Sequence, residues 1–109
     1  MTYQEINTII ESLGYQCAYH HFAVNTALSP QFICFYYEQS DDLYADNINY
    51  QRIDTLIVEF YSAHKDIPAE LNIEAVFKQN EMTFSKDELF IEDQNMYETI
   101  YYIEVITNG

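Results

Sequence analysis

The chain has 109 residues, of which 49% are hydrophobic, and it contains only two glycines and two prolines. This is the size of one domain with one core, and the apolar content excludes a chain that is disordered throughout. Eighteen acidic residues stand against four basic ones, for a formal net charge of −14. Binding to a phosphate backbone or to an anionic membrane surface needs clustered Lys and Arg, so both are disfavoured; solubility alone is an equally simple explanation of the charge.

A helix is predicted over residues 2–13. Thr2 and Glu5 have the spacing of a capping box, and Gly14 stands where a helix commonly ends in a left-handed residue. The apolar positions between them repeat at helical spacing, which predicts one buried stripe made of Ile6, Ile9, Ile10 and Leu13.

Three strands and a long loop are expected next. Residues 15–24 are rich in aromatic and β-branched side chains, which favours a strand, and a turn over residues 25–30 leads to a strand over residues 31–38 that is apolar on both faces. Residues 39–51 are polar and acidic and predict a loop. Residues 52–62 then alternate as a strand, with one face formed by Leu56, Val58 and Phe60 and the other by Ile53, Ile57 and Tyr61.

The second half of the chain predicts a helix and then more strands. Pro68 marks the first turn of a helix that is capped by Asp66 or Ile67 and ends near Asn80. Its apolar stripe consists of Ala69, Ile73, Val76 and Phe77. Residues 82–85 and 89–91 read as short strands around a turn at residues 86–88, and residues 96–107 read as a long strand. This order, α-β-β-β-α-β-β with one short strand uncertain, predicts a single α+β domain over residues 1–109 with a largely antiparallel sheet and two helices.

Catalytic and metal-binding patterns are not evident in the sequence. His20 and His21 are adjacent, so a strand would send them to opposite faces, and Cys17 and Cys34 lack the close spacing of zinc ligands. A phosphate-binding glycine loop is difficult to build from two glycines. The acidic segment 41–47 lacks the glycine and the downstream glutamate of a calcium loop. We therefore expect no enzyme, no cofactor and no metal.

The N-terminal residues carry neither the basic nor the apolar region of a signal peptide, and the longest apolar stretch is far too short to span a membrane. We expect a protein that is made in a reducing cytoplasm, with no membrane contact and with Cys17 and Cys34 free and buried.

Aromatic residues make up 17% of the chain, with eleven Tyr, seven Phe and no Trp. Phe60, Phe77 and Tyr101 are expected in the core. Tyr44 and Tyr50 lie among acidic residues in the predicted loop, where tyrosine suits a surface that is covered on association. A loop that merely folds onto its own domain is the alternative. The predicted contact residues are Tyr44, Ala45, Asp46, Asn47 and Tyr50.

A family resemblance covers about residues 31–106. It is carried by a middle block and by the C-terminal strands, namely Phe35-Tyr36-Tyr37, Ser40, Asp41, Tyr44-Ala45-Asp46-Asn47, Tyr50, Ile53, Glu59-Phe60-Tyr61, Lys65-Asp66, Phe84, Ile91-Glu92, Met96-Tyr97 and Tyr101. This pattern resembles the tail-terminator proteins, also called tail-completion or tail-to-head joining proteins, of long-tailed phages and prophages of Gram-positive bacteria. The resemblance implies a structural virion protein, made in the host cytoplasm, that forms a hexameric ring between the tail tube protein and the head connector.

Such a ring would let DNA pass through its hole without sequence-specific binding, and acidic side chains facing the lumen would repel phosphates. Two other roles remain open. One is a connector adaptor or minor capsid component of the same gene block, and the other is an acidic inhibitor whose carboxylates mimic DNA.

Replacing both Tyr44 and Tyr50 with Ala should weaken assembly and change the free energy of unfolding of the monomer by less than about 0.5 kcal/mol. Sedimentation and chemical unfolding of the same variant measure the two effects. Equal loss of assembly and stability would place both rings in the fold.

Overall fold

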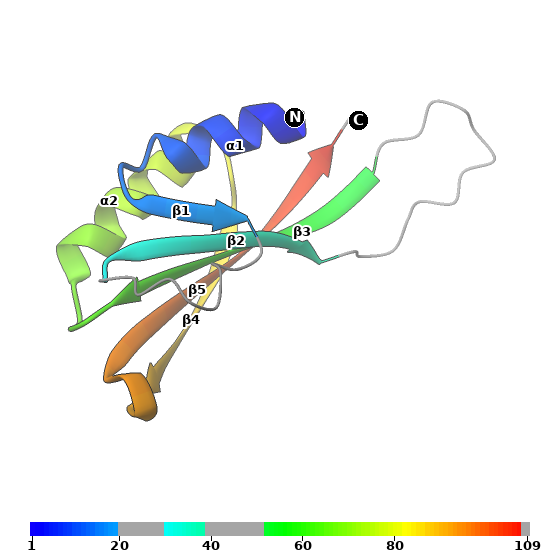
Figure 1. Ribbon diagram of the computed structural model, residues 1–109. Coiled ribbons are helices and arrows are strands. Elements are labelled where there is room, and N and C mark those ends of the chain that lie inside the picture. The colour runs from blue at the N-terminus through cyan, green and yellow to red at the C-terminus, as the bar shows by residue number, and fades with distance from the viewer. Residues whose placement is uncertain (20–29, 39–51, 108–109) are drawn as a thin grey trace.

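The computed structural model describes residues 1–19, 30–38 and 52–107, which form a five-stranded, mostly antiparallel sheet with two helices on one of its faces (Figure 1). The predicted α+β class and the order α-β-β-β-α-β-β are confirmed. The elements are α1 (Tyr3–Glu11), β1 (Gln16–Tyr19), β2 (Phe32–Glu38), β3 (Arg52–Ser62), α2 (Ile67–Gln79), β4 (Phe84–Ile91), the short 3₁₀ helix η1 (Glu92–Gln94) and β5 (Met96–Thr107).

The strands lie in the order β1-β2-β3-β5-β4 across the sheet. β1 runs parallel to β2, and every other neighbouring pair is antiparallel. The long strands β3 and β5 form the centre, where the pairing runs from Arg52 opposite Thr107 to Ser62 opposite Tyr97. Because successive side chains alternate between the two faces, this register decides which residues lie under the helices and which lie on the open face.

The predicted N-cap of α1 is confirmed, whereas the helix ends at Glu11, two residues before the predicted end. The Thr2 hydroxyl accepts a hydrogen bond from the Glu5 backbone N–H at 3.1 Å, and the Glu5 carboxylate accepts one from the Thr2 N–H at 2.8 Å. Gly14 has φ +87°, the left-handed conformation that favours glycine. The predicted stripe faces the sheet, with Ile6 and Ile10 fully buried and Ile9 and Leu13 partly buried.

α2 also begins as predicted. The Asp66 side chain caps it by accepting a hydrogen bond from the Ala69 N–H at 3.1 Å, and Pro68 lies in the first turn. Ala69, Ile73 and Phe77 are buried. Val76 is only half-buried, and the further buried position on this helix belongs to Glu70.

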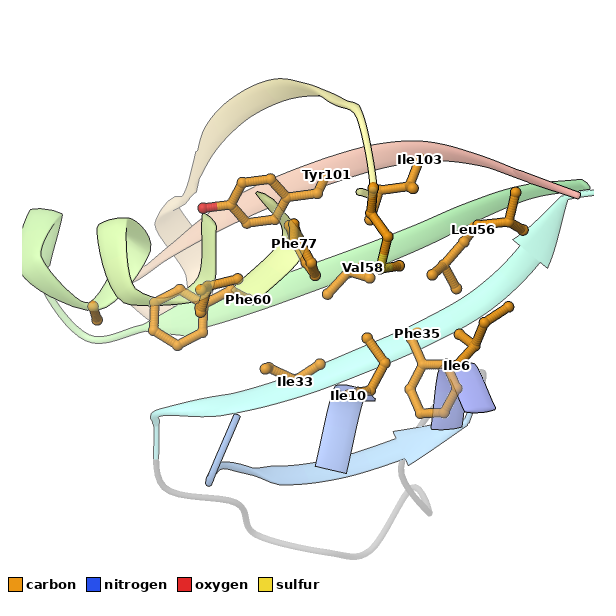
Figure 2. Packing of buried hydrophobic residues seen from close by; sticks show 14 residues of the cluster. Ile6, Ile10, Ile33, Phe35, Leu56, Val58, Phe60, Phe77, Tyr101 and Ile103 are labelled. Atoms are coloured by element: carbon orange, nitrogen blue, oxygen red, sulfur yellow. The ribbon is translucent and has the colours of Figure 1, made fainter. Parts of the chain in front are cut away.

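The core lies between the helices and the covered face of the sheet. Figure 2 shows Ile6 and Ile10 of α1 directed at Ile33 and Phe35 of β2, beside a group of core residues from α2, β3 and β5. Phe77, Phe84 and Tyr101 contact one another edge to face, with ring centroids 5.3 to 5.7 Å apart. Phe60, Phe77 and Tyr101 are therefore core residues, as predicted. Burial of each large side chain of this kind contributes about 1.5 to 3 kcal/mol to folding.

The turn predicted at residues 86–88 is wrong, because β4 is one continuous strand that pairs with β5 along its whole length. β4 is an edge strand, and charged side chains such as those of Lys86, Asp87 and Glu88 are common at edges because they prevent pairing with other chains. The charged residues 86–88 therefore indicate a strand at the edge of the sheet and not a turn between two strands.

Two of the four basic residues, Lys65 and Lys86, form ion pairs with Glu70 of α2. The Glu70 side chain is buried, with 3% of its surface exposed. Its carboxylate lies 2.8 Å from Lys65 Nζ and 2.7 Å from Lys86 Nζ. Lys86 also contacts Glu74, which accepts a hydrogen bond from the Tyr101 hydroxyl at 3.0 Å, and Lys65 also contacts Glu88. Burial by itself would raise the pKa of Glu70, but the hydrogen bonds from both lysines outweigh it and hold the pKa below its ordinary value.

Replacing Glu70 with Gln should lower the free energy of unfolding at pH 7 by about 1 to 3 kcal/mol, because both lysines lose a charged partner inside the fold. Urea unfolding followed by circular dichroism measures the change. The matched control is Glu104→Gln, which removes one negative charge from an exposed position of β5 and should leave stability nearly unchanged. Equal effects of the two substitutions would contradict the structural role of this ion cluster.

Candidate functional site

The contact residues predicted from the sequence lie outside the described residues, because the structure describes no residue between 38 and 52. The prediction therefore stays untested for Tyr44, Ala45, Asp46, Asn47 and Tyr50. What the structure adds is the sheet to which this segment connects at both ends, through β2 and β3.

The face of the sheet away from the helices is the candidate interaction surface. The register places alternate residues of every strand on it, and one row crosses the sheet through Tyr36, Ile57 and Tyr102. Apolar side chains on this face are exposed at two ends. Tyr102 is 37% and Ile106 50% exposed on β5, whereas Leu89 is 43% exposed on β4. Helices of the described chain cover the opposite face only (Figure 1).

Two carboxylates lie on this face near the end of the sheet where η1 connects β4 to β5. Glu98 of β5 pairs across the sheet with Tyr61 of β3, and Glu59 precedes Tyr61 by two positions on the same face. The Tyr61 hydroxyl lies 3.2 Å from Glu59 Oε1 and 3.3 Å from Glu98 Oε2. The Tyr61 ring stacks on Phe32 with centroids 4.8 Å apart and planes at 19°. Two acidic groups and one hydroxyl thus share a small, largely apolar area.

Glu98 is only 7% exposed, and its burial, its hydrogen bond with Glu59 and the negative charge of Glu59 raise its pKa to about 7, against a smaller opposing effect of the hydrogen bond from Tyr61. Burial and the same two carboxylates also raise the pKa of Tyr61, so its hydroxyl stays protonated. Near neutral pH the Glu98 carboxyl therefore gains or loses its proton, and the charge of this face changes with pH.

Acid–base catalysis would need these carboxylates to meet a substrate in a cleft. Neither of them lines the pocket of about 610 Å³ under α1, nor a second pocket beside Phe84. Because burial raises the pKa of Glu98, a molecule that covered this face would favour the protonated, neutral form of that side chain.

The other sequence candidates do not gather into a site. Cys17 and Cys34 form no disulfide with each other, and Cys34 is buried whereas Cys17 is half-buried. Burial and, to a smaller extent, the charge of Glu11 raise the pKa of Cys17. His64 is exposed, and His20 and His21 lie outside the described residues. Within the described ranges no group of three His, Cys, Asp or Glu side chains could hold a metal ion. No helix there is both long and apolar enough to cross a membrane.

Comparison of the chain with protein-family models finds no match, and comparison with curated proteins finds none either.

Replacing Glu98 with Gln should stabilise the protein at pH 8 and change little at pH 4.5. The raised pKa means that the folded state keeps its proton until about pH 7, whereas the unfolded chain releases it near pH 4.5. The protonated glutamate thus favours folding below pH 4.5, and this contribution is lost as the pH rises through 7. We expect a gain of about 1 to 3 kcal/mol at pH 8.

Urea unfolding of the wild type and of Glu98→Gln at the two pH values tests this expectation. Glu104→Gln, on the same strand and face but exposed, should show no such pH-dependent gain. A gain of equal size at both pH values would contradict the raised pKa of Glu98.

Proposed function

We propose that this chain is a structural phage or prophage protein that acts by protein–protein contact and assembles as a ring at the head-proximal end of the tail. In this role it ends the tail tube and joins it to the head connector. The single observation that carries the proposal is the open face of the sheet, where exposed apolar side chains lie among carboxylates and are covered by no helix of the described chain.

A closed ring needs two different patches on each subunit. The first, which we name the sheet patch, consists of Tyr102 and Ile106 on the open face. The second, the hairpin patch, consists of Leu89 and Phe90 on β4, which alternate between the two faces and are 43% and 45% exposed. The Phe90 ring packs against Tyr97 with centroids 4.9 Å apart, so this patch keeps a defined shape.

The two patches are separated along β5. Leu89 pairs with Glu98, whereas Tyr102 lies four and Ile106 eight positions further along β5, which corresponds to about 14 Å and about 27 Å along an antiparallel strand. Patches separated in this way on one rigid sheet can contact two different neighbours at once. This geometry supports a heterologous contact, which a ring requires.

The resemblance to tail-terminator proteins supports the same role. In the described part of the chain its residues lie on β2, β3, β4 and β5, in η1 and just before α2, and Phe60 and Tyr101 among them belong to the core. The net charge of −14 supports a conduit through which DNA passes without sticking.

A double variant, Tyr102→Ser with Ile106→Ser, should abolish ring formation on tail tubes and leave the monomer folded. Leu71→Ser is the matched control, since Leu71 is 58% exposed on α2 in the helical layer, and it should assemble normally. Electron microscopy of tubes incubated with each variant measures assembly, and circular dichroism checks folding. Normal assembly of the double variant would refute the sheet patch.

Electron microscopy of tails produced without this chain tests the function itself. Tubes of uncontrolled length support a terminator, whereas tails of normal length that never join heads indicate a connector adaptor. Normal virions, together with tight binding of the monomer to a basic host enzyme, would instead indicate an acidic inhibitor.

A further inference from the structure

The outer side of α2, opposite the side that packs on the sheet, carries a second apolar stripe. It consists of Ile67, Leu71 and Ala75, which follow one another at a spacing of four residues and so share one side of the helix. Ile67 is 56% and Leu71 58% exposed, and no other large hydrophobic side chain of the described chain is more exposed than these two. The solvent side of a helix is usually polar. We name this surface the helix stripe.

The helix stripe carries no carboxylate. Glu70 and Glu74, the acidic residues of α2, are turned towards Lys65 and Lys86, with which they form ion pairs. Lys78 lies at the C-terminal end of the outer side and forms no ion pair with any residue that the structure describes. In a chain with a net charge of −14, this apolar surface is therefore bordered by a positive charge and not by negative ones.

The sheet patch and the hairpin patch, by contrast, lie beside exposed carboxylates. Tyr102 and Ile106 flank Glu104 on β5, and Leu89 and Phe90 follow Glu88 on β4. Two copies that met symmetrically through either patch would bring like charges close together, which costs free energy. Of the three apolar patches, only the helix stripe can meet an identical surface without this repulsion.

From this pattern we propose that the helix stripe binds the helix stripe of a second copy of this chain, with the two α2 helices antiparallel about a twofold axis. A twofold contact joins the same patch of both subunits. Side chains four residues apart form ridges that interdigitate when two helices pack, and the small Ala75 allows a close approach. Because Leu71 is the middle residue of the stripe, the axis brings the two Leu71 side chains close together.

The size of α2 sets the strength of this contact. The helix has 13 residues, so it is about 20 Å long and about 10 Å wide. Pairing two such helices buries roughly 200 to 400 Å² per copy, compared with about 800 Å² per partner in a stable complex. The dimer is therefore weak, with a dissociation constant on the order of 100 µM. It does not depend on the proposed ring, which uses the sheet patch and the hairpin patch.

Sedimentation equilibrium of the full chain from about 10 µM to about 1 mM should show a reversible monomer–dimer equilibrium. Leu71→Ser removes one apolar side chain from each half of the contact and should raise the dissociation constant at least about tenfold. The matched control is the double variant Tyr102→Ser with Ile106→Ser, which changes exposed side chains on the opposite face of the sheet and should dimerise as the wild type does. On tail tubes the two variants are expected to behave the other way round, so failure of the dimer and failure of the ring can be told apart.

A charge exchange at Leu71 tests whether the partner is a second copy. Leu71→Glu and Leu71→Lys should each be monomeric, because like charges then meet at the twofold axis, and both should stay folded because the position is exposed. An equimolar mixture of the two variants should dimerise. Raising the NaCl concentration from about 20 mM to about 300 mM should strengthen the wild-type dimer, because salt screens the repulsion between two chains of net charge −14.

Several results would overturn the proposal. They are a chain that stays monomeric at about 1 mM, a dimer that Leu71→Ser leaves unaltered, and a mixture of the two charge variants that does not associate. Loss of the dimer in the Tyr102 and Ile106 double variant would assign the contact to the open face instead. A dimer that weakens as salt is added would also contradict an apolar contact, because it would show that ion pairs hold the copies together.

Discussion

The pairing of β3 with β5 is the constraint on which the rest of this structure depends. Every residue of β3 pairs with a residue of β5, and the alternation of side chains along these strands divides the protein into two unlike halves. Leu56, Val58 and Tyr101 are sent under the helices. A shift of β3 by one position would bring Glu59 into the apolar core, and a shift of β5 would bring in Glu98. Either shift is costly, which favours the observed alignment.

The two halves then take different roles. The covered half holds the core and the ion cluster around Glu70, so it determines stability. The open half carries the exposed apolar side chains of Tyr102, Ile106 and Leu89, and the Glu59–Glu98 pair lies close to Leu89. Glu98 is buried on this half and is tolerated there because it keeps its proton until about pH 7. On the face away from the helices Ile57 and Ile100 are buried, so the candidate interaction surface is limited to the exposed side chains of Tyr102, Ile106 and Leu89.

Much of this fold could be predicted from local patterns. The capping box at Thr2, the left-handed Gly14, the Asp66 cap and the bounds of β3 and β5 all follow from short-range chemistry, and all are confirmed. The continuity of β4 could not be predicted in this way. Lys86 belongs to the strand because β5 pairs with it and because Glu70 and Glu74 lie above it, and these partners are distant in sequence.

The candidate site was still harder to predict. Among eighteen acidic residues nothing local distinguishes Glu59 and Glu98, which are brought together only by the register of two strands. The one signal in the sequence is that Glu59 and Glu98 each interrupt a stretch of apolar residues. The pocket under α1 likewise joins Tyr3 to Asp54, 51 positions apart. The spacing of apolar residues in a sequence predicts helices and strands. A site that combines side chains from neighbouring strands can be predicted only when the register of those strands is known.

The confinement of Lys65 and Lys86 to the helical layer has a consequence for how copies of this chain can meet. The open face carries Glu38, Glu59, Asp87, Glu98 and Glu104, and no cation among the described residues. Two such faces repel each other, so a symmetric back-to-back dimer is opposed by electrostatics. A contact between the open face of one copy and a different surface of the next would avoid placing two open faces together. Such a head-to-tail contact is heterologous, so it can repeat from one copy to the next.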